Sequence, residues 1–132
     1  MPKILVADPI GAEGVDLLKA HAEVDVKTGM DPQDLLAIIA DYEGLVVRSE
    51  TKVTKEVIEQ AKKLQVVGRA GIGVDNIDLE SATAAGIAVV NAPTGNTVAA
   101  AEHTMALMLA SVSYTHLRAH ETRHDLVCRL LL

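Results

Sequence analysis

Short apolar runs alternate with segments of helical periodicity along residues 1–111. Five runs have the length and apolar character of strands, and each is followed by a segment whose apolar positions recur at helical spacing. This succession predicts an α/β fold in which a parallel five-stranded sheet is covered by helices on both faces, because parallel neighbours need a crossover connection. The expected strands are residues 3–7, 23–28, 44–47, 65–68 and 87–90.

Capping residues indicate where several of the helices begin. Asp31, Thr54 and Asp78 each precede a helical pattern, and Gly86 ends the helix that Asp78 begins. A last helix is expected over 97–111, and it is apolar on nearly every side. We expect such a helix to pack against a neighbour, and nothing further in the chain is available to cover it.

Three polar side chains stand at the carboxyl ends of neighbouring strands. Arg48, Arg69 and Asn91 each follow an apolar run, and ligands of open parallel sheets bind beyond these ends. A guanidinium presents paired donors to a carboxylate or phosphate, so two of them would converge on one small anion. The alternative is that the two arginines are surface residues paired with Glu50 or Asp75.

The segment Gly71-Ile72-Gly73 lies next to Arg69 and lets backbone approach a ligand closely. It is not a dinucleotide fingerprint, because Asn76 occupies the place of the third glycine and no long helix begins there. Asp75 and Asp78 fit a turn and a helix cap better than a metal site, so no metal is expected here.

Composition narrows the class of protein further. The chain is 132 residues long with 49% hydrophobic residues, a net charge of −6 and one Cys. These values predict one globular domain in the reducing cytoplasm, with no nucleic-acid partner and no membrane segment. The ligand that the arginines bind must then be held by local geometry.

Residues 112–132 differ from the rest, since they hold three of the five His and the only Cys. His120-Glu121-Thr122-Arg123-His124 fits the HExxH zinc motif, with His116 on the same helical face, and on its own would suggest a metalloprotease. However, the segment resembles the translation of a transposon-library sequencing adapter over 112–122 and 126–132. We therefore expect it to be a non-native tail.

Specific motifs in residues 1–111 resemble those of the NAD-dependent D-2-hydroxyacid dehydrogenases. They are Val47-Arg48-Ser49, the run from Arg69 to Asn76, the run from Asn91 to Asn96, and Ala101-Glu102-His103. The combination is most similar to the phosphoglycerate branch of that family, whose members oxidise D-3-phosphoglycerate to 3-phosphohydroxypyruvate with NAD in serine biosynthesis.

The resemblance implies a domain organisation and a set of roles. Residues 1–96 would be a flavodoxin-like substrate domain, and 97–111 a connecting helix into an absent NAD-binding domain. The family's catalytic Arg, Glu and His match no position here, so the chain alone is expected to be inactive. The intact enzyme would use NAD, bind a phosphorylated 2-hydroxy acid and form a homo-oligomer. The implied substrate-binding residues are Arg48, Ser49, Arg69, Gly71, Gly73 and Asn91, with Ile72 as a cofactor contact.

Three alternatives remain open at this point. The chain could belong to another D-2-hydroxyacid dehydrogenase, of the glyoxylate or hydroxypyruvate reductase type. It could instead be a noncatalytic anion-binding module. The zinc metalloprotease is the third.

Overall fold

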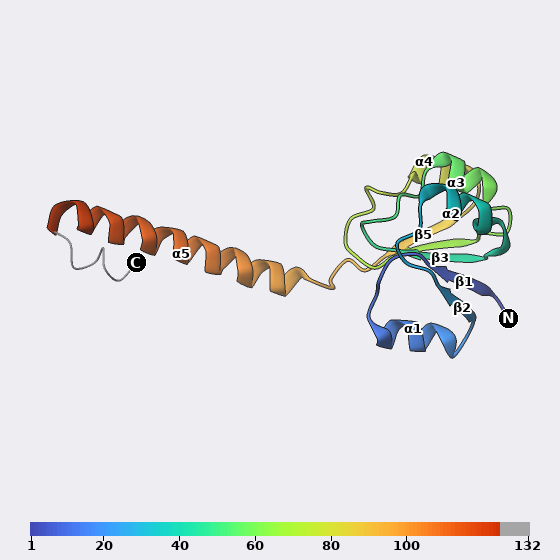
Figure 1. The fold of residues 1–132 in the computed structure, drawn as a ribbon, viewed down its shortest axis with the longest axis horizontal. Helices are drawn as coiled ribbons and strands as arrows, with labels where there is room; N and C mark the ends of the chain where they lie inside the picture. Colours follow the sequence, from blue (N-terminus) through green and yellow to red (C-terminus); the bar gives the residue numbers. More distant parts are fainter. Residues whose placement is uncertain (125–132) are drawn as a thin grey trace. The chain divides into compact units, whose positions relative to one another are not determined.

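A computed structural model of the chain describes the backbone of residues 1–124 and the side chains of residues 1–113. It divides into two compact units, residues 1–95 and 96–132. The first unit contains a five-stranded parallel sheet in the order β2-β1-β3-β4-β5, which confirms the predicted fold class (Figure 1). The strands are β1 (Lys3–Val6), β2 (Glu23–Val26), β3 (Gly44–Val47), β4 (Val66–Arg69) and β5 (Ala88–Asn91).

Helices cover the sheet on both faces. Figure 1 shows α1 on one face and α2, α3 and α4 together on the other. A short 3-10 turn, η1, continues α2. The bounds are α1 (Ala12–Lys19), α2 (Pro32–Ile38), η1 (Ile39–Asp41), α3 (Lys55–Gln60) and α4 (Leu79–Ala84).

The helix starts agree with the predicted caps in position, but not always in chemistry. Asp31 and Thr54 occupy the cap positions of α2 and α3 without a side-chain cap bond. Asp78 does cap α4, because its carboxylate accepts hydrogen bonds from the backbone N–H and the hydroxyl of Ser81, each at 3.0 Å. These bonds lower the pKa of Asp78. Gly86 follows α4 with a φ of 72°, a left-handed conformation that suits glycine.

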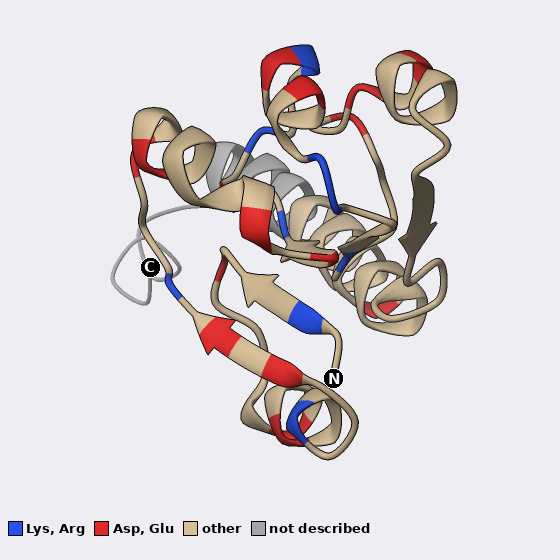
Figure 2. Cartoon of the chain, turned by 90° about the vertical axis from the view of Figure 1, so that its right-hand side faces the viewer, with Lys and Arg blue, Asp and Glu red and all other residues tan. Residues whose placement is uncertain are grey.

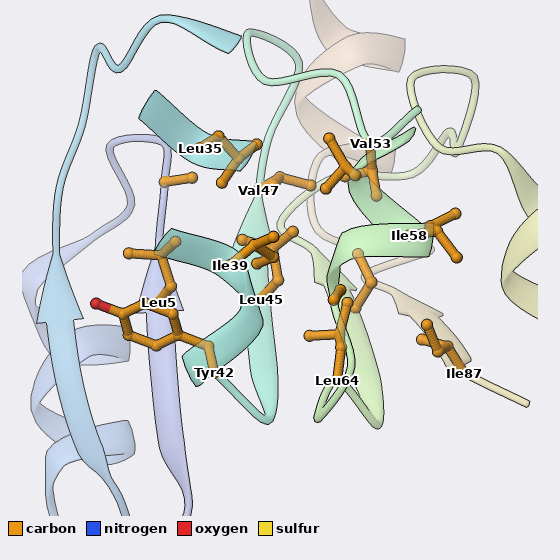
Figure 3. Close-up of a cluster of buried hydrophobic side chains, with 14 of the residues drawn as sticks. Leu5, Leu35, Ile39, Tyr42, Leu45, Val47, Val53, Ile58, Leu64 and Ile87 are labelled. Atoms are coloured by element: carbon orange, nitrogen blue, oxygen red, sulfur yellow. The ribbon is translucent and has the colours of Figure 1, made fainter. Parts of the chain in front are cut away.

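The hydrophobic core lies between the sheet and the helices α2, α3 and α4 (Figure 3). Leu5, Leu45 and Val67 are paired across β1, β3 and β4 and are almost completely buried. Leu35 and Ile39 pack onto this layer from α2 and η1, and Val57, Ile58 and Leu64 complete it from α3 and the segment after it. The central strands are therefore fixed in register by one continuous apolar layer.

The second unit contains one helix, α5 (Thr97–His124). The prediction placed its start correctly at residue 97 but ended it near 111. The helix continues because residues 97–124 contain neither glycine nor proline to interrupt it. Apolar side chains along it are exposed, among them Val98, Met105, Leu107, Met108 and Leu109. In the part of the chain that the structure describes, no helix has the length and apolar character needed to cross a membrane.

Candidate functional site

The register of the sheet brings the predicted polar residues to one edge. Val47, Arg69 and Asn91 are partners across β3, β4 and β5, and Arg48 is the residue directly after Val47. The strands β4 and β5 each run one residue further than expected, so Arg69 and Asn91 are the last strand residues and do not follow the strands. The structure thus places Arg48, Arg69 and Asn91 side by side at the carboxyl edge.

Arg48 has a well-held backbone and an exposed side chain. Its N–H donates to Asp8 Oδ2 at 2.6 Å, and its carbonyl accepts from Asn76 Nδ2 at 2.7 Å and from Arg69 Nε at 3.1 Å. No ion pair joins its guanidinium to any residue whose side chain the structure describes, so the alternative pairing with Glu50 is absent there. The adjacent Ser49 is exposed as well. Arg48 therefore offers an uncommitted cation at the edge of the sheet.

The side chain of Arg69 is committed to its own chain and is only 11% exposed. Besides the bond to Arg48, its Nη1 donates to the carbonyl of Gly73, and its Nη2 lies 3.4 Å from Asp75 Oδ1. The alternative pairing of Arg69 with Asp75 is thus present in the structure. The carboxylate of Asp75 is 86% exposed, and ion pairs in contact with solvent are weak.

The glycine segment forms a rim beside the arginines. Asn91 Nδ2 donates to the carbonyl of Ile72 at 2.6 Å, and the N–H of Ala92 donates to the carbonyl of Gly71 at 3.0 Å. A Cβ at Gly73 would lie 2.8 Å from Arg69 Nη1 and 2.9 Å from Asp75 Oδ1, so a larger residue there would displace the ends of these two side chains. Ile72, between the glycines, is 44% exposed. Asn91 and Ala92, at the end of β5, therefore hold the backbone of this glycine rim through hydrogen bonds.

Two residues of this site were missed in the sequence. Asp8 lies after the carboxyl end of β1, as Arg48 lies after that of β3. It was missed because a carboxylate does not suggest a binding site for an anion. Asn76 was considered only as a departure from the dinucleotide fingerprint. Both side chains are hydrogen-bonded to the backbone of residues 48 and 51. The signal for Asp8 was its position shortly after the first apolar run, at the same end of the sheet as Arg48 and Arg69.

The surroundings are acidic, so attraction of an anion must come from the site itself. Figure 2 shows acidic residues on each of the helices that pack on the sheet. Within the described residues, no group of three or more His, Cys, Asp and Glu side chains could hold a metal ion. The side chains of His116, His120 and His124 lie outside the described residues, and so does the zinc motif they would form.

Comparisons with known proteins agree on one family. The family model described as "D-isomer specific 2-hydroxyacid dehydrogenase, catalytic domain" matches residues 4–129. A D-3-phosphoglycerate dehydrogenase from Archaeoglobus fulgidus is 56% identical over 110 residues, which are 83% of this chain and 21% of the relative. The chain therefore spans about a fifth of the length of that curated relative.

Two solved structures share the fold. The PH0520 protein from Pyrococcus horikoshii OT3 is 32% identical with a TM-score of 0.79, covering 93% of this chain and 37% of that one. A 3-phosphoglycerate dehydrogenase from Entamoeba histolytica, described with bound NAD+, is 33% identical with a TM-score of 0.71. That match covers 81% of this chain and 38% of the other.

Proposed function

The chain belongs to the family of D-isomer specific 2-hydroxyacid dehydrogenases, and we propose that it is the substrate-binding part of a D-3-phosphoglycerate dehydrogenase. The whole enzyme would oxidise D-3-phosphoglycerate to 3-phosphohydroxypyruvate with NAD. The single observation that carries the proposal is the placement of Arg48 and Arg69 at adjoining strand ends, joined by the bond from Arg69 Nε to the Arg48 carbonyl. The name and identity of the Archaeoglobus fulgidus relative support the choice of substrate.

In this proposal the two arginines have different tasks. Arg48, whose guanidinium is unpaired within the described residues, binds an anionic group of the substrate directly, with the exposed Ser49 hydroxyl beside it. Arg69 presents its positive charge from a fixed position. An incoming anion can replace the exposed carboxylate of Asp75 at Arg69, because that ion pair is weakly held.

The rim of Gly71, Ile72 and Gly73 completes the substrate side of the site. Its carbonyls are engaged by Asn91, Ala92 and Arg69, which fixes the backbone that would meet the substrate. The exposed Ile72 side chain is suited to contact the edge of a cofactor.

The described residues fit such an edge contact but not the binding of a whole dinucleotide. The helix after the rim is α4, which has only six residues and begins at Leu79, and Asn76 stands where a fingerprint glycine belongs. NAD supplies the hydride acceptor in the proposed enzyme. We place its main binding groups in the part of the enzyme that the relatives have beyond this alignment.

The proposal is tested by titrating the chain with D-3-phosphoglycerate while its backbone resonances are followed by NMR. We expect shifts at residues 48, 49, 69 and 71–73, and a loss of about tenfold or more in affinity in Arg48→Gln. Lys19→Gln is the matched control, since it removes the same charge from an exposed position on α1. Equal affinity in the Arg48→Gln variant and its control would overturn the proposal. Tighter binding of glyoxylate or hydroxypyruvate than of phosphoglycerate would move the chain to another branch of the family.

We further propose that the intact enzyme is a cytoplasmic homo-oligomer. The single Cys supports a reducing compartment.

We also propose that residues 112–132 are not native. The alignment to the Archaeoglobus fulgidus relative covers 83% of this chain and leaves 17% uncovered, whereas the family model extends to residue 129. A long DNA read across codons 105–132, prepared without the suspected adapter, decides this point. Genomic codons for the tail would refute the proposal and make zinc binding the next question.

A further inference from the structure

Asp8 is the one charged side chain that is buried among the described residues, with 1% of its surface exposed. It lies just beyond β1, under the turn that follows β3. A buried carboxylate is costly unless it is hydrogen-bonded, and this one is fully used. Its Oδ2 accepts from the N–H groups of Arg48 and Thr51, at 2.6 Å and 3.1 Å, and its Oδ1 accepts from the Thr51 hydroxyl.

Asn76 holds the same turn through its carbonyls. Its Nδ2 donates to the carbonyl of Arg48 and to that of Thr51, each at 2.7 Å. Its own backbone carbonyl accepts from the N–H of Val53 at 2.8 Å, which ties it to the following segment. The Oδ1 atom of Asn76 is buried and has no hydrogen-bond partner. The side chain is therefore used for its two donors.

We propose that Asp8 and Asn76 are positioning residues that clamp the turn of residues 48–51 and thereby aim Arg48 at the bound anion. Asp8 takes the amides at both ends of the turn, and Asn76 takes the carbonyls at both ends. The root of the Arg48 side chain is thus fixed, while its guanidinium stays exposed. A turn that is already ordered has little conformational entropy left to lose when the anion binds.

The negative charge of Asp8 is compatible with anion binding by Arg48. The Asp8 carboxylate is buried and accepts hydrogen bonds from three donors of the turn, whereas the side chain of Arg48 extends from the same turn to solvent. The inference rests on the proposed function, because it assumes that Arg48 binds an anion.

Thr51 allows a test that leaves the anion-binding groups untouched. Thr51→Val keeps the shape of the side chain and removes the hydroxyl donor to Asp8, whereas Thr51→Ser keeps the donor. Asn76→Asp keeps the shape at Asn76 and removes both donors to the turn. For each variant we would measure amide hydrogen exchange at residues 48 and 51, with Val67 in β4 as a core reference, and the affinity for D-3-phosphoglycerate.

We expect Thr51→Val and Asn76→Asp to lose protection at residues 48 and 51 and to bind about three- to tenfold more weakly. Protection at Val67 should stay unchanged, and Thr51→Ser should behave as the unmodified chain. Loss of protection with unchanged affinity would show that the clamp is only structural and would overturn the inference. Equal weakening in Thr51→Ser would do the same, because the donor is retained there.

The Arg48→Gln variant separates the two proposals. Weak binding in Arg48→Gln with normal binding in the clamp variants overturns the clamp and leaves the proposed function standing. Absence of phosphoglycerate binding in the unmodified chain overturns both. Should Asn76→Asp fail to fold, the two Thr51 variants carry the test.

Discussion

Three side chains, Lys3, Asp25 and Tyr42, form a polar cluster beside the outermost strand β2. The Tyr42 hydroxyl donates to Asp25 Oδ2 at 2.7 Å, and Lys3 Nζ lies 3.3 Å from the same oxygen and 5.1 Å from the centre of the Tyr42 ring. The bond from Tyr42, followed by Lys3, lowers the pKa of Asp25. Burial and the Asp25 carboxylate raise the pKa of Tyr42 to about 12. The folded chain therefore favours a charged Asp25 beside a neutral Tyr42.

These shifts predict a stability difference between the unmodified chain and Tyr42→Phe that depends on pH in two windows. Asp25 has a lowered pKa, so its contribution is present above its unfolded value of 3.8 and is lost as pH falls through the folded pKa. Tyr42 has a raised pKa, so its contribution is present below 10 and is lost as pH rises toward 12. Urea unfolding at a series of pH values should show the largest difference near neutrality. A difference that is constant with pH would contradict the prediction.

Glycine conformation gives a second prediction at the scale of single residues. Gly86 has a φ of 72° and open space around it, so an added Cβ meets no neighbour and only the backbone is strained. Gly86→Ala should lower the free energy of unfolding by about 1 kcal/mol. Gly11→Ala is the control, since Gly11 has a φ of −58° and equally open space. Denaturant unfolding of both variants checks this, and equal stabilities would refute it.

At the scale of elements, the central strands and the helices above them were predictable because their apolar positions are periodic. The strand β2 alternates charged and apolar residues, as edge strands commonly do, and it lies at one edge of the sheet. Strand ends were less accurate: β1 and β2 end one and two residues earlier than predicted, and β4 and β5 begin and end one residue later. Hydrogen bonds from neighbouring strands extend the ladder to Arg69 and Asn91, and a polar side chain gives no local sign of this.

The core layer predicts a large contrast between two leucines. Leu45 on β3 is 1% exposed and packs in the core, whereas Leu17 on α1 is 66% exposed. Leu45→Ala should cost about 3 kcal/mol of unfolding free energy through lost burial and a cavity. Leu17→Ala should change it by less than about 0.5 kcal/mol. Urea denaturation measures both, and a similar loss of unfolding free energy at the two positions would contradict the prediction.

At the scale of the whole molecule, we propose that the chain supplies the substrate side of a dehydrogenase, and the resemblance matches none of its residues to the catalytic Arg, Glu and His of the family. We predict that the purified chain forms no NADH from NAD+ and D-3-phosphoglycerate. The absorbance of NADH measures this directly, with a complete phosphoglycerate dehydrogenase as the positive control. Turnover by the purified chain would contradict the prediction. Binding of phosphoglycerate without turnover is the expected combination.

A second prediction at this scale concerns residues 112–132. The core cluster extends only from Leu5 to Ile87, within the first compact unit. Truncation after Ser111 should therefore leave the unfolding transition of residues 1–95 unchanged. Thermal and urea unfolding of the full chain and of the truncated chain measure this transition, and Leu45→Ala serves as a reference for a destabilised core. A shift as large as that reference would show that the tail supports the core.

The sequence by itself determined the α/β class, the strand succession and the two arginines at strand ends. Apolar periodicity and capping residues are local, so they can be followed along the chain without knowledge of distant contacts. The tertiary structure alone decided that Arg69 bonds to the carbonyl of Arg48, and that Asp8 and Asn76 hold the turn after β3. These bonds join residues 21 to 43 positions apart, and a polar residue gives no periodic signal of its partner. Only the folded sheet brings such donors and acceptors within reach of one another.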